Sequence, residues 1–117
     1  MTLSVHRVLI VEGEQVFVDV DHPLTMAGFE VCRRDVWGSE ALIALGAQVL
    51  PKLRSDDVYA FDEELLLLER DVELLFDHLA AVAEATGYRE DFIRHRAGNI
   101  RDAVIWAKAN GGGVIIW

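Results

Sequence analysis

Cysteine, proline and basic side chains are scarce in this sequence. It has one cysteine and two prolines in 117 residues, and 11 basic side chains against 20 acidic ones. A single cysteine, Cys32, excludes a disulfide within the chain, which fits a reducing compartment. Few prolines and 52% apolar residues argue against a disordered chain. The length and composition predict one globular domain over residues 1–117.

Long apolar stretches are also missing. No stretch reaches the length of a membrane span, so we expect no membrane association. The first residues lack the long apolar region and small-residue cleavage site of a secretory signal. These absences predict a cytoplasmic protein.

The shortage of bases leaves a net charge of −9, which is spread unevenly. Residues 55–91 have 2 basic and 12 acidic side chains, whereas residues 92–117 have 4 basic and 1 acidic. Phosphate backbones repel an acidic surface, so we expect no nucleic-acid binding. The acidic segment is either a solvated surface that keeps the protein soluble or a docking face for a basic partner.

Apolar alternation and turn residues predict strands at both ends of the chain. Residues 6–21 predict a β-hairpin whose turn is formed by Glu12, Gly13 and Glu14, with Gly13 free to take positive φ. Residues 7–11 are apolar on both faces, which is typical of a central strand. A third strand is expected at residues 29–33, with Cys32 inside it. Residues 114–117 predict a closing strand after three glycines.

The three glycines follow a helix and precede a strand. Phosphate-binding loops have the opposite order, because the N-terminus of a helix must direct its amides at the anion. We therefore interpret Asn110 or Gly111 as a helix cap and expect no nucleotide cofactor, nor any other.

Three helical regions are predicted between these strands. Ser39 begins the first, which Pro51 ends. Asp62 begins the second, and Gly87 ends it. The third region, residues 89–110, is interrupted at Gly98 and Asn99 and is expected to form two short helices. The second region has an apolar stripe with alternating spacings of three and four residues: Leu65, Leu68, Val72, Leu75, Leu79 and Val82. Such a stripe indicates either a central core helix or a dimer seam.

Together these segments predict an α+β fold. A small, mostly antiparallel sheet, made of the N-terminal hairpin and the C-terminal strand, is packed against three or four helices, one of them long and central.

Few residues suggest chemistry. Asp19, Asp21 and His22 have the oxygen and imidazole groups of a metal site, but no second cluster completes a ligand set, so no metal is predicted. Arg94 and Arg101 share a helix face; they either pair with acidic side chains of the preceding helix or bind an anion. A nucleophilic role for Cys32 requires a histidine beside it.

The remaining candidates suggest contacts with a protein. Glu69, Glu73 and Asp77 lie in the acidic segment. Trp37, in a polar loop, either covers the core or is exposed as an interface anchor.

The sequence shows no catalytic constellation, so an enzyme is not favoured. The preferred hypothesis is a non-catalytic protein-binding module, for example an acidic inhibitor or immunity-type protein that docks a basic partner. The open alternatives are a small-ligand- or metal-binding protein and a homodimeric accessory subunit.

Overall fold

The computed structural model describes residues 2–18 and 26–117, which form one mixed α and β structure. In chain order the elements are β1 (Thr2–Val11), β2 (Glu14–Val18), β3 (Met26–Phe29), the π-helical turn η1 (Arg33–Trp37), α1 (Glu40–Ala44), the 3-10 helix η2 (Leu50–Arg54), β4 (Val58–Ala60), α2 (Glu63–Asp77), α3 (Leu79–Thr86), α4 (Glu90–Asn110) and β5 (Gly113–Ile116). Among the described residues, no helix combines the length and the apolar character needed to cross a membrane.

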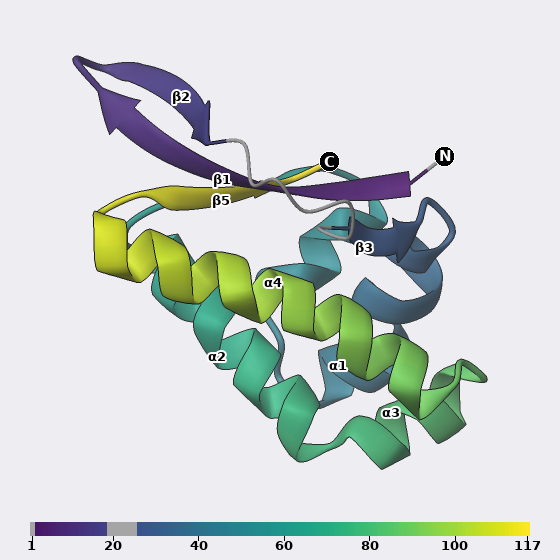
Figure 1. The fold of residues 1–117 in the computed structure, drawn as a ribbon. Coiled ribbons are helices and arrows are strands. Elements are labelled where there is room, and N and C mark those ends of the chain that lie inside the picture. The colour runs from purple at the N-terminus through teal and green to yellow at the C-terminus, as the bar shows by residue number, and fades with distance from the viewer. Residues whose placement is uncertain (1, 19–25) are drawn as a thin grey trace.

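The strands form one antiparallel sheet in the order β2-β1-β5-β4, with β3 paired to β1. β1 is central because it pairs with β2, β3 and β5. The helices cover one face of this sheet, and α4 runs across that face (Figure 1). The expected α+β fold, with an N-terminal hairpin, a C-terminal strand and one long central helix, is therefore confirmed.

The two faces of the sheet have different surroundings. Alternate residues of β1, β4 and β5 belong to the core under the helices: Leu3, Val5, Val58, Ala60, Val114 and Ile116. The register pairs Ile115 with His6 and with Tyr59, so these three side chains share the opposite face. There the rings of His6, Phe17, Tyr59 and Trp117 contact one another, with centroids 5.0–6.2 Å apart.

The predicted hairpin turn, the Ser39 helix cap and the glycine helix ends are present in the structure. Glu12 and Gly13 make the hairpin turn with φ of 52° and 81°. The Ser39 side chain accepts a hydrogen bond from the Leu42 amide at the start of α1. Gly87 and Gly111 end α3 and α4 in the left-handed conformation, which glycine adopts without the steric penalty of a Cβ.

The helices differ from the prediction in where they break. Residues 62–87 form two helices, α2 and α3, because His78 leaves helical geometry and its Nδ1 lies 2.9 Å from the Leu74 carbonyl oxygen. This bend lets both helices pack against α4. All six residues of the apolar stripe are nevertheless buried.

The expected break in the third region is absent. α4 is continuous from Glu90 to Asn110 and is the long helix of the fold. The Asn99 side chain donates to the Met26 carbonyl oxygen at 2.9 Å instead of capping a new helix.

Four further expectations are wrong in detail. The third strand ends at Phe29, and Cys32 lies in the turn before η1. α1 ends after five residues, close to Gly46, which has φ of 95°, and Pro51 lies in the first turn of η2 instead of ending α1. β4 occupies a segment expected to be a loop. Asp62 makes no side-chain capping hydrogen bond.

Candidate functional site

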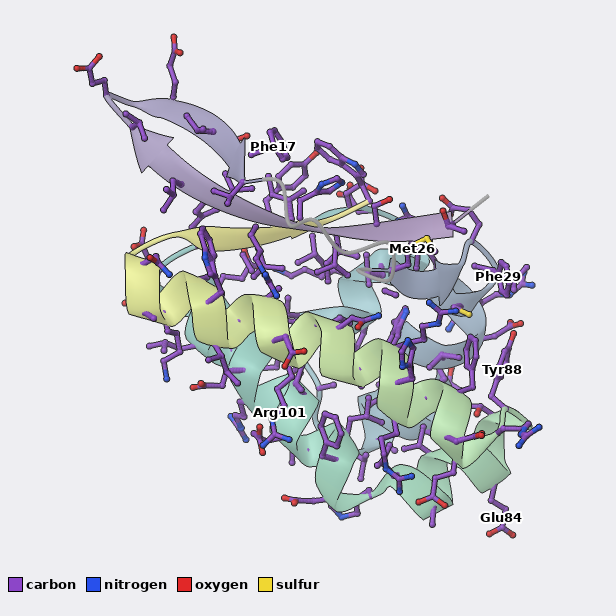
Figure 2. All side chains as sticks on the ribbon, viewed as in Figure 1. Phe17, Met26, Phe29, Glu84, Tyr88 and Arg101 are labelled. Carbon is purple, nitrogen blue, oxygen red and sulfur yellow. The ribbon has the colours of Figure 1, made fainter. Side chains whose placement is uncertain are left out.

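Most of the charged residues predicted to bind a partner are engaged within the chain. Glu69 and Glu73 of α2 form ion pairs with Lys108 and Arg101 of α4, at 2.8 and 3.2 Å. The Arg101 guanidinium also lies over the Phe76 ring, 4.9 Å from its centroid. Figure 2 labels Arg101, whose side chain lies at the α2–α4 junction. These charges are paired across the junction of α2 and α4, so the structure does not present them as a free docking face.

The other predicted residues are dispersed. Arg94 pairs with Glu90 one turn earlier, at 3.0 Å, and Asp77 is exposed at the end of α2. Trp37 is 1% exposed, and its indole donates to the Ala27 carbonyl oxygen at 2.9 Å. Its ring therefore closes the core and offers no surface to a partner.

The proposed metal ligands Asp19, Asp21 and His22 lie outside the described residues. In the part of the chain that the structure describes, no group of three or more His, Cys, Asp or Glu side chains is arranged to hold a metal ion.

Cys32 lies in a small polar cluster with Tyr88 and Asp35. The thiol is buried, and this burial raises its pKa above the usual value. The Tyr88 hydroxyl donates to Asp35 at 3.1 Å, and burial together with this hydrogen bond raises the pKa of Tyr88 to about 12. A nucleophilic cysteine needs access and a lowered pKa. The arrangement keeps Cys32 a neutral, packed thiol.

Three hollows have charged linings, and in two of them the charges are already paired. One, of about 210 Å³, lies between α2 and α4 and includes Glu69, Glu73 and Arg101. Another, of about 550 Å³, includes Arg54 and Glu40, which pair at 3.6 Å, and Arg34 and Asp35, which pair at 3.5 Å. A small-molecule site usually presents a few convergent polar groups to its ligand. In these two hollows the polar groups face one another.

The pattern of ion pairs leaves a surplus of acid at the surface. Eight of the eleven basic side chains form ion pairs within the described chain: Arg33, Arg34, Lys52, Arg54, Arg89, Arg94, Arg101 and Lys108. Eight exposed acidic side chains form none in that part of the chain: Glu12, Glu14, Asp56, Asp62, Glu63, Asp77, Glu84 and Asp102. The described part of the chain thus presents a surplus of unpaired carboxylates to solvent.

A cluster of exposed apolar side chains lies on the β1–β2 hairpin. Beyond Val8 the described sheet narrows to two strands, because β5 pairs with β1 only from Val5 to Val8. This two-stranded end, residues 9–17, is called the arm below, and it extends away from the helices (Figure 1). Four large apolar side chains of the arm are 40–50% exposed: Ile10, Val11, Val16 and Phe17. Glu12 and Glu14, at its tip, are the only charged residues in it.

The sequence predicts these residues only as part of a hairpin with a central first strand. Their exposure could not be read from the sequence, because runs that are apolar on both faces are ordinarily buried on both. A weak signal was present in the two glutamates that enclose Gly13, since they keep the hairpin tip in water.

Two structural residues were also missed. Asp71 is a buried carboxylate, 1% exposed, that accepts hydrogen bonds from the backbone amides of Gln48, Val49 and Leu50 at 2.7–3.1 Å. Arg33 joins η1 to the loop before β4 through Glu30 and Asp57, at 2.6 and 2.7 Å. Both lie in charged stretches that resemble solvated surface.

Comparison of the chain with protein-family models, with curated proteins and with solved structures finds no match in any of the three. The account of function therefore depends on the geometry of the chain itself.

Proposed function

We propose that this chain is a non-catalytic protein-binding module that docks a basic protein partner. The observation that carries the proposal is the distribution of charge: most bases are used in internal ion pairs, while eight exposed carboxylates have no counter-ion in the described chain. Surface carboxylates of this kind attract a basic protein over a distance and orient it before contact.

Two features support binding over catalysis. The buried, neutral Cys32 thiol is unsuited to nucleophilic attack. The charged side chains that line two of the hollows are already in ion pairs, which leaves them poorly placed to act on a substrate. An acidic inhibitor of a basic enzyme is a form of binding module that fits a small chain with this charge.

A library of random peptides displayed on yeast tests the proposal. The full chain, labelled with a fluorophore, is used to sort the library at about 0.15 M salt, where charges more than about 8 Å apart are screened. We expect the sorted peptides to be enriched in Lys and Arg. Sorted peptides with the charge composition of the unsorted library, or with excess acid, would contradict the proposal.

A charge-neutralised variant provides the control for folding. Glu63→Gln, Glu84→Gln and Asp102→Asn remove three unpaired carboxylates from the helices without touching an ion pair. We expect this variant to keep the urea midpoint of the wild type within the small range of surface substitutions and to bind the sorted peptides more slowly.

A further inference from the structure

We propose that the arm takes an extended segment of the basic partner along the edge of β2 that has no partner strand among the described residues. This inference rests on the proposed function and names the surface and the kind of segment that it binds.

The arm has apolar side chains on both of its faces. The register places Leu9 opposite Val16 and Val8 opposite Phe17, and neighbouring residues of a strand point to opposite faces. Val11 and Val16 therefore share one face, while Ile10 and Phe17 share the other, and all four are 40–50% exposed. In Figure 2, Phe17 lies on the side of the sheet away from the helices. A flat partner surface can cover only one of these faces.

A strand added at the edge of β2 reaches both faces. Its own side chains alternate to the two sides of the ribbon, next to those of β2, while its backbone continues the hydrogen-bonded ladder. In the described chain β2 pairs only with β1. Its sequence, EQVFV, contains neither the lysine nor the proline that commonly protects an edge strand from pairing.

The stability of the arm also favours an added strand. A two-stranded ribbon without a covering layer is marginally stable in water, and a third strand increases its stability substantially. Residues 9–17 form such a two-stranded ribbon, because β5 pairs with β1 no further along the described chain than Val8. Binding a strand thus buries apolar surface that folding of the chain alone leaves in water.

The tip of the arm selects the charge of the bound segment. Glu12 and Glu14 are exposed and unpaired within the described residues. Glu12 has φ of 52°, a conformation in which glycine and asparagine are favoured and a glutamate is strained. The turn would form more easily with either of those residues, so local folding does not account for the carboxylate. Basic side chains of a bound segment would complement it.

The same charges disfavour two other occupants. A membrane would have to admit the tip first, and the tip contains two carboxylates, which are costly to desolvate and are repelled by anionic lipids. A second copy of the chain brings a net charge of −9, and most of its bases are already in ion pairs. An apolar and basic segment of another protein fits the arm best.

Synthetic strand peptides test this assignment on the full chain. The first peptide alternates Lys with Val, the second alternates Glu with Val, and the third has the Lys–Val sequence with every backbone amide methylated. Binding is followed by the shifts of backbone amide signals in two-dimensional NMR spectra. We expect the Lys–Val peptide to shift residues 9–17 and the methylated peptide, which cannot donate to a ladder, to bind at least about tenfold more weakly.

Two double variants, whose replaced side chains have similar exposure, provide the second part of the test. Ile10→Thr with Val16→Thr removes one apolar group from each face of the arm and retains β-branched residues. Leu66→Gln with Ile105→Gln changes helical side chains that are 53% and 56% exposed. We expect only the arm variant to weaken the Lys–Val peptide by about tenfold. The methylated peptide provides the same comparison on the unchanged protein if the arm variant fails to fold.

The outcomes distinguish the two proposals. If the Lys–Val peptide binds but shifts only helical residues, and the arm variant binds it as the wild type does, the arm inference is wrong and the proposed function stands. If the Glu–Val peptide binds as tightly as the Lys–Val peptide, both are wrong. Self-association of the chain through the arm, detected by sedimentation without peptide, would also overturn the assignment to a basic partner.

Discussion

Replacing Asp71 is expected to cost more stability than any surface change in the acidic segment. Its carboxylate holds three successive backbone amides where the chain enters η2, and two of the donors belong to Val49 and Leu50, which are buried. Asp71→Ala leaves these amides without their acceptor. Each unsatisfied buried donor costs about 1–3 kcal/mol, so the two buried amides alone would cost about 2–6 kcal/mol.

A compensating effect reduces this figure. The variant no longer has to desolvate a carboxylate, and that desolvation costs several kcal/mol. We therefore expect a net loss of about 1–3 kcal/mol, because the variant leaves neutral amides and no uncompensated charge in the core. Asp71→Asn keeps one acceptor oxygen but presents an NH₂ group to the amides, so we expect a loss of similar size. Domains of this kind are stable by about 5–15 kcal/mol.

Urea unfolding followed by circular dichroism measures both losses, provided that the slope with urea stays constant. Asp77→Asn is the matched control, because Asp77 lies on the same helix and is exposed; it should change stability by no more than about 0.5 kcal/mol. Hydrogen exchange at residues 48–50 should accelerate in the Asp71 variants before the rest of the chain does. An Asp71→Ala variant as stable as the control would refute this role of the carboxylate.

Three further predictions concern the core. Gly113→Ala should lose several kcal/mol of stability in urea unfolding, because its Cβ would overlap the Phe61 ring. Gly98→Ala, which has open space in α4, should gain about 0.5–1 kcal/mol of stability. Equal urea midpoints would refute the close approach of Gly113 to Phe61. Cys32 should react with a thiol reagent only after unfolding, and rapid labelling of the native chain would contradict its burial. The fold raises the pKa of Tyr88 to about 12, which means that the folded state favours the neutral hydroxyl. The contribution of Tyr88 to the stability of the fold should therefore be complete below about pH 10 and disappear as the pH approaches 12. A Tyr88→Phe variant that loses the same stability at alkaline pH would contradict this.

Local signals in the sequence predicted the elements whose causes are local. The Glu12–Gly13 turn, the Ser39 cap and the Gly111 end of α4 depend on backbone geometry within a few residues. The apolar stripe of residues 65–82 likewise identified buried positions, because spacing alone places them on one face.

The parts that sequence reasoning missed depend on contacts between distant residues. Asn99 was expected to cap a helix, but Met26 lies within reach and takes its side-chain amide. Asp71 resembles its acidic neighbours in sequence, and only the fold places amides of residues 48–50 against it.

The candidate site was predictable only in its charge. The acidic excess is a property of composition, but which carboxylates are paired depends on how α2 and α4 pack. Glu69 and Glu73 face Lys108 and Arg101 across that contact, whereas Glu12 and Glu14 lie at the tip of the arm, beyond the helices.

The association rate of a basic strand peptide as a function of salt measures whether the acidic surface guides a basic partner to the arm. With the alternating Lys–Val peptide and the full chain, stopped-flow measurements should show an association rate that falls steeply as salt rises from about 0.01 to 0.5 M, because screening shortens from about 30 Å to a few ångströms. Glu12→Gln with Glu14→Gln should reduce both the rate and its dependence on salt, with an unchanged urea midpoint. A rate that is insensitive to salt and to these substitutions would show that the acidic surface does not guide a basic partner to the arm.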